Sequence, residues 1–97
     1  MKIVNCGYIY DTNKADDCWD EQTEFDGSNH ISLATGSQWN HERLFVTGNQ
    51  RYFVWWWSAW QGATDKLFPL THNEAAEWLI RNQYDLPDHL ADVLKEA

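Results

Sequence analysis

The chain reads RLFVTGNQRYFVWWW from Arg43 to Trp57, and this stretch carries the clearest β-strand signal of the sequence. Arg43–Thr47 and Arg51–Trp57 are both rich in aromatic and β-branched residues, which is typical of strands. Gly48-Asn49-Gln50 lies between them and predicts a tight loop in which glycine is available for a positive φ. The segment therefore predicts an antiparallel β-hairpin.

The second strand of this hairpin is apolar on both faces. Successive side chains along a strand point to opposite sides, so the strand presents two apolar sets. These sets are Tyr52, Val54 and Trp56 on one face, and Phe53, Trp55 and Trp57 on the other. A strand of this kind is normally central in its sheet and covered on both sides.

Shorter runs on either side of this hairpin predict further strands. Lys2–Asn5 and Tyr8–Tyr10, separated by Cys6-Gly7, predict a small N-terminal hairpin. From Cys18 to Phe25, a more apolar set of side chains alternates with a mostly acidic one, which predicts one strand with a mostly acidic face. The run His30–Thr35 predicts another strand. Lys66–Leu70 predicts the last strand, which Pro69 places at an edge or a strand end.

The hydrophobic period changes after Leu70. Thr71-His72-Asn73-Glu74 has the pattern of a capping box and predicts a helix over His72–Asn82. Asp85-Leu86-Pro87 is expected to open a second helix. The apolar stripes of the two helices are Ala75, Trp78 and Leu79, and Leu86, Leu90, Val93 and Leu94. The expected fold is α+β: one domain over residues 1–97, with a twisted antiparallel meander of five or six strands followed by two C-terminal helices.

The charge of the chain is negative and uneven. Seven Lys and Arg against fifteen Asp and Glu give 7 − 15 = −8. Asp11–Asp26 contains seven acidic residues and one lysine, a local sum of −6, and the remaining residues sum to −2. A binder of the phosphate backbone needs clustered cations, so direct nucleic-acid binding is not expected. The acidic segment is interpreted either as a solvated face or as a patch that binds a basic partner.

The chain has seven tryptophans, and four of them lie at Trp55-Trp56-Trp57 and Trp60. A small domain needs large rings in its core, so most of these rings are expected to be buried. Three adjacent rings cannot all face one side, and Trp60 lies in a loop sequence with Gly62. One or two of them are therefore expected at the surface, where tryptophan is a strong interface anchor.

Motifs for catalysis or metal binding are missing from the sequence. The histidines have no HxxxH spacing and the cysteines no CxxC partner, so a zinc site has no motif; a site assembled in three dimensions from His30, His41 and an aspartate stays open. No nucleophile motif, phosphate loop or EF-hand order is present. Cys6 and Cys18 are interpreted as reduced thiols of a cytoplasmic protein, because no signal peptide or membrane span is recognised.

The stretch from Glu42 to Leu94 resembles a diffuse family of small bacterial and phage-borne proteins. Their shared pattern is a leucine-aromatic strand, a T-G-N turn, an aromatic second strand and P-L-T-x-x-E-A-x-x-W-L. Here these elements are Leu44–Thr47, Gly48-Asn49, Tyr52–Val54, and Pro69-Leu70-Thr71 with Glu74-Ala75 and Trp78-Leu79. The resemblance implies a fold and assigns no catalytic residue.

These observations predict a non-enzymatic acidic binding protein without a cofactor. Its expected partner is a basic protein surface, such as that of a nucleic-acid-binding effector complex. In size and charge it is similar to phage and mobile-element inhibitors of the anti-CRISPR class. The predicted contact residues are Asp16, Asp17, Asp20, Glu21, Glu24, Trp57 and Trp60. The alternatives are a homodimeric scaffold that associates through tryptophans and a small sugar-binding or enzymatic module.

Overall fold

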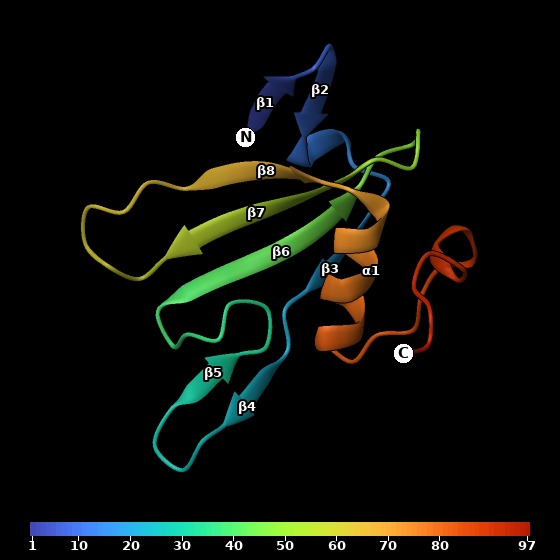
Figure 1. Cartoon of the computed structure of the whole chain (residues 1–97). Helices are drawn as coiled ribbons and strands as arrows, with labels where there is room; N and C mark the ends of the chain where they lie inside the picture. Colours follow the sequence, from blue (N-terminus) through green and yellow to red (C-terminus); the bar gives the residue numbers. More distant parts are fainter.

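A computed structural model describes all residues from Met1 to Ala97. It contains eight strands in three sheets, one α-helix and two short 3₁₀ turns (Figure 1). The strands are β1 Lys2–Asn5, β2 Tyr8–Asp11, β3 Asp17–Asp20, β4 Thr23–Phe25, β5 His30–Ser32, β6 Asn40–Val46, β7 Tyr52–Ser58 and β8 Lys66–Leu70. The helix is α1 His72–Arg81, and the 3₁₀ turns are η1 Thr12–Lys14 and η2 Asp88–Leu90.

The main sheet is antiparallel with the strand order β3-β6-β7-β8. The predicted hairpin is confirmed, and Leu44 of β6 lies opposite Val54 of β7. Its loop differs from the prediction, since the positive φ of 60° falls on Gln50 and not on Gly48. Gly48 instead lies against a carboxylate, because a Cβ at this position would be 3.4 Å from Asp16 Oδ2.

One face of the main sheet, called the helix face, is covered by α1. Thr71 Oγ1 accepts a hydrogen bond from the Glu74 amide at 3.1 Å, and Glu74 Oε1 accepts one from the Thr71 amide at 2.9 Å, so the capping box is confirmed. The helix buries its predicted stripe, and Trp78 is only 1% exposed. This core consists of Leu44, Val46, Tyr52, Val54, Ala75, Ala76, Trp78, Leu79 and Leu90.

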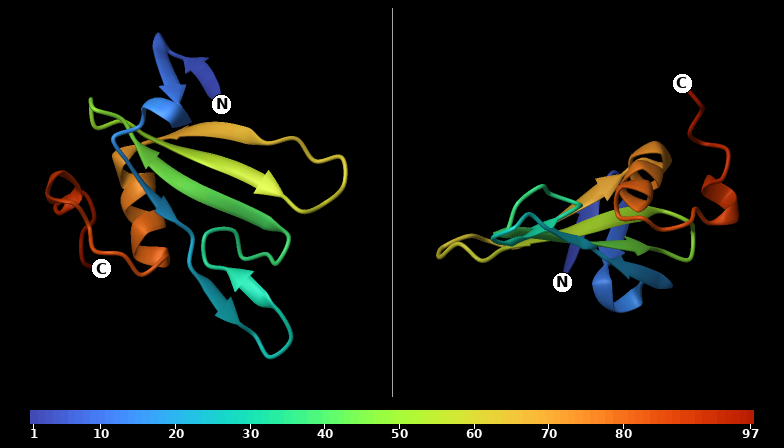
Figure 2. Two further views of the ribbon diagram at one scale, coloured as in Figure 1. Left: turned by 180° about the vertical axis from the view of Figure 1, so that it is seen from behind. Right: turned by 90° about the horizontal axis from the view of Figure 1, so that it is seen from below.

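The other face of the main sheet, called the hairpin face, is covered over part of its area by the N-terminal hairpin β1–β2. That hairpin is confirmed, and its turn residues Cys6 and Gly7 have φ of 50° and 83°. Tyr10 of β2 packs with Phe45, Phe53 and Leu67 of the sheet. Figure 2 shows α1 on one face of the sheet and the N-terminal hairpin extending past the edge strand β8. The hairpin leaves the far ends of β6 and β7 without a cover.

The prediction of one strand from Cys18 to Phe25 is wrong. The strand β3 ends at Asp20, and Thr23–Phe25 forms β4 in a separate two-stranded sheet with β5, which projects from the main sheet (Figure 1). The chain breaks here because Glu21 turns inward and bonds other strands. The predicted strand His30–Thr35 also ends early, at Ser32, because the Ser32 hydroxyl accepts from the amides of the next turn.

The second predicted helix is also wrong, and with it the expected α+β fold with two C-terminal helices. The protein is mostly β, and only Asp88–Leu90 forms a 3₁₀ turn in the C-terminal segment. Pro87 provides no side-chain cap, and a helix this short gains little from propagation after a costly nucleus. Leu90 still packs into the core, although it does so from a segment that is not an α-helix. The helix α1 lacks the length and apolar composition needed to cross a bilayer.

Candidate functional site

The uncovered part of the hairpin face is lined by aromatic rings. Register places His41 of β6 opposite Trp57 of β7, and Arg43 opposite Trp55. Residues opposite each other in an antiparallel pair lie on the same face. The ring centroids of His41 and Trp57 are 5.6 Å apart, and those of Trp55 and Trp57 are 5.4 Å apart. All three rings are only half-buried.

A second pair of rings lies at the end of the same two strands. The centroids of Trp39 and Trp60 are 4.9 Å apart, and these residues are 41% and 61% exposed. The Trp39 carbonyl accepts a hydrogen bond from the Ala59 amide at 2.8 Å, which extends the β6–β7 pairing to these loops. We call the five residues His41, Trp55, Trp57, Trp39 and Trp60 the aromatic platform.

Two carboxylates border the aromatic platform, and one of them fixes a ring of it. The Trp55 indole donates from Nε1 to Asp65 Oδ2 at 3.1 Å. Arg43 donates from Nε to Asp20 Oδ1 at 2.6 Å, and the Asp20 side chain is largely exposed. Arg43 and Asp20 neutralise each other, so this surface offers the ring faces and the Asp65 carboxylate rather than free cations.

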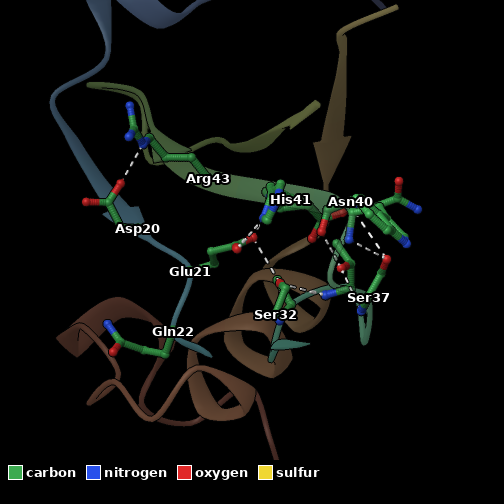
Figure 3. Close-up of polar contacts among 12 residues, drawn as sticks. Asp20, Glu21, Gln22, Ser32, Ser37, Asn40, His41 and Arg43 are labelled. Carbon is green, nitrogen blue, oxygen red and sulfur yellow. Dashed lines mark hydrogen bonds and ion pairs between the residues drawn. The ribbon is translucent and has the colours of Figure 1, made fainter. Parts of the chain in front are cut away.

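Glu21 connects the platform to the rest of the fold (Figure 3). Its Oε2 accepts from His41 Nδ1 at 2.7 Å, and its Oε1 accepts from Ser32 Oγ at 2.9 Å and from the Glu42 amide at 2.7 Å. An ionised carboxylate only accepts, so Nδ1 of His41 carries a proton in this contact. The Glu21 side chain is 11% exposed, so it positions the His41 ring from inside the molecule.

The structure does not gather the predicted acidic residues into one surface. Asp17 lies on the helix face and Asp20 on the hairpin face, because they have opposite parity in β3. Asp17 accepts from the Cys18 amide, and it is a smaller cause, after burial, of the raised pKa of Tyr52, which is about 12. Asp16 lies against Gly48 and Glu24 lies on the projecting β4–β5 hairpin. Asp20 pairs with Arg43, which lies opposite Trp55, and Glu21 bonds His41, whose ring stacks on the predicted Trp57.

Sequence reasoning missed His41, Trp55, Trp39 and Asp65 as parts of this surface. Trp55 was visible in the alternation of its strand, but its partner His41 depends on the β6–β7 register. The sequence carried no signal for Asp65, which reaches the indole from a loop. The open possibility of a His30/His41/Asp metal site is not realised: no three histidine, cysteine or acidic side chains converge in a way that could hold a metal ion, and His30 packs on Phe25.

Comparison of the chain with protein-family models, with curated proteins and with solved structures found no match in any of the three. The resemblance noted in the sequence therefore stays a prediction. What the fold and site define is a small antiparallel sheet domain, covered by one helix on one face and carrying a partly bare aromatic surface on the other.

Proposed function

We propose that this protein is a non-enzymatic binding module whose aromatic platform docks onto a basic surface of a partner protein. The observation that carries the proposal is the exposed Trp39–Trp60 pair, which lies next to the half-buried Trp55 and Trp57 in a chain of net charge −8.

The geometry of the platform suits it to act as an anchor. A tryptophan ring contributes about 150–250 Å² of contact area, and tryptophans are enriched among the residues that dominate interface energies. Trp55 and Trp57 are held by a strand in the middle of the main sheet, and Asp65 fixes the Trp55 indole. Little side-chain freedom is left to lose when a partner covers these rings.

The charge of the surface favours a cationic partner. Guanidinium groups stack on tryptophan faces, and Asp65 supplies a carboxylate at the edge of the same surface, where Asp20 is already paired with Arg43. The remaining negative charge, including Glu24 on the projecting hairpin, steers a basic partner toward the protein at low salt. The narrower prediction, an inhibitor that occupies a nucleic-acid-binding surface, is one form of this proposal.

Two matched pairs of variants test the role of the rings. Trp60 and Phe25 are 61% and 60% exposed, but only Trp60 belongs to the platform. Trp57 and Trp56 are chain neighbours that point to opposite faces. A short oligo-arginine peptide is titrated into each variant by calorimetry. Trp60→Ala and Trp57→Ala are expected to weaken binding about fivefold or more, which corresponds to ~1 kcal/mol, while Phe25→Ala and Trp56→Ala leave it unchanged.

Unchanged binding in all four variants would mean that bulk charge alone holds the peptide, and equal losses within each pair would mean that the platform position does not matter. Either result would overturn the proposal. Sedimentation velocity over a range of concentrations provides a second readout. A dimer that Trp60→Ala converts to monomer would favour the homodimeric scaffold instead. A glycan that binds more tightly than the arginine peptide at the same rings would favour the sugar-binding module.

A further inference from the structure

A groove of about 430 Å³ lies on the helix face, away from the aromatic platform. It runs between α1 and the strands β7 and β8, and its size falls in the range of roughly 300–1,000 Å³ seen for small-molecule sites. The helix contributes positions at i, i+3, i+4 and i+7, which form one side of a helix. These helix residues are Glu74, Glu77, Trp78 and Arg81.

The groove is amphipathic. Its sheet side is apolar, with the buried Val54 beside Phe68 and Leu70. Its charged lining consists of three glutamates and one arginine, so the formal charge of the lining is 1 − 3 = −2. Arg81 has no carboxylate oxygen within 4.0 Å and therefore does not neutralise the acids by a close ion pair.

Glu42 is the one charged group that the groove receives from the sheet. Its Oε1 accepts a hydrogen bond from Trp78 Nε1 at 3.0 Å, while its Oε2 makes no hydrogen bond to the protein. Burial raises the pKa of this carboxyl, and Glu21 raises it further, against the lowering effects of the Trp78 hydrogen bond and of Arg81. A cation placed at Oε2 would recover the electrostatic stabilisation that burial removes.

We propose that this groove binds a primary alkylammonium group, with the charge at Glu42 and the alkyl chain along Val54, Phe68 and Leu70. An ammonium is a compact charge that a single free carboxylate oxygen can take, whereas a guanidinium prefers two parallel acceptors and Oε1 is already occupied. Aliphatic stems of this kind pack along apolar surface and keep the charged head at its edge. The alkylammonium is supplied either by a lysine side chain of another protein or by a free diamine. The site is independent of the aromatic platform.

The Trp78 indole provides a specific reporter, because its N–H contacts Glu42 directly. Butylammonium and its neutral counterpart butanol are titrated into the protein, and the Trp78 Nε1–H signal is followed by ¹H–¹⁵N NMR. Butylammonium is expected to shift this signal, and Glu42→Gln, which keeps an acceptor for the indole, is expected to weaken binding about tenfold. Glu24→Gln removes one exposed negative charge outside the groove and is expected to change nothing. Binding should strengthen as the pH rises through the pKa of Glu42.

Three results would overturn the proposal: no shift of the Trp78 signal, an equal response to butanol, or an unchanged affinity in Glu42→Gln. A capped lysine peptide and cadaverine then separate the two sources, since both present the same head group and the tighter binder identifies the source. Trp60→Ala should leave this binding unchanged. A negative result for the groove proposal can therefore be distinguished from a negative result for the platform proposal.

Discussion

The two faces of the main sheet are made by the same strands and are equally rich in rings, yet they differ in what covers them. On the helix face, Tyr52 and Val54 are sealed by α1 and by Leu90, whereas Trp56 at the far end of the same strand is half-buried. On the hairpin face, Phe53 is sealed by β1–β2, whereas Trp55 and Trp57 of the same strand are half-bare. A strand's composition therefore does not separate core from surface; the length of the elements that cover it does.

The largest expected effect distinguishes a covered ring from a bare one. Trp78→Ala removes a ring that is 1% exposed and also removes the donor to Glu42. We expect it to lower the free energy of unfolding by about 3–5 kcal/mol, which urea titration measures. Trp60→Ala is expected to change it by less than about 0.5 kcal/mol. Similar losses in both variants would break the distinction between the two faces.

The next effect concerns two acidic residues that the sequence treats alike. Glu21→Ala leaves the Glu42 amide and the Ser32 hydroxyl without their acceptor, so a loss of about 2–3 kcal/mol is expected. Glu24→Ala, at an exposed position on β4, should stay within about 0.5 kcal/mol. Circular dichroism in a urea series compares the two. If Glu21→Ala were as mild as Glu24→Ala, Glu21 would not position His41 and the platform.

The sequence predicted those elements whose signals are local. The β6–β7 hairpin and the helix capped by Thr71 follow from residue types over a few positions, and both are confirmed. The break between β3 and β4 could not be predicted, because Glu21 leaves the strand to bond Ser32 and His41, which are distant in the chain. The prediction of a helix in the C-terminal segment was wrong because its signal was local but not sufficient. The apolar spacing fits a helix, yet Leu90 packs into the core from a 3₁₀ turn.

The candidate site was predictable only in part. Trp57 and Trp60 could be named because three adjacent rings and a loop ring cannot all be buried. The aromatic platform as a surface needed the cross-strand register and the extent of the N-terminal hairpin, which are tertiary facts. The acidic segment was misleading as a patch, because Asp17 and Asp20 lie on opposite faces of β3.

A smaller effect tests how much the N-terminal cap of α1 contributes to stability. Thr71→Ala removes the hydroxyl that accepts from the Glu74 amide, which should cost about 1 kcal/mol of unfolding free energy. Thr64→Ala, at an exposed loop position, is the matched control and should be neutral. Thermal denaturation of the two variants gives the difference. A neutral Thr71→Ala would mean that α1 is held in place by packing alone.

The smallest effect is a pH dependence that belongs to the helix face. The pKa of Glu42 is raised by burial, so between its unfolded and folded pKa values the folded state binds more protons than the unfolded state. Stability therefore falls as the pH rises from about 4.5 through the folded pKa. Glu42→Gln should remove this fall, as measured by urea titrations at several pH values. If the wild-type protein instead gained stability over this window relative to Glu42→Gln, the predicted pH dependence would be wrong in sign.

The most direct test of the division between the two faces is an NMR titration of the seven tryptophan indole signals with an oligo-arginine peptide. Signals of Trp39, Trp57 and Trp60 are predicted to shift together at low salt, while the signal of Trp78, buried between α1 and the sheet, stays in place. A peptide that moves the Trp78 signal and leaves those three unchanged would contradict the account.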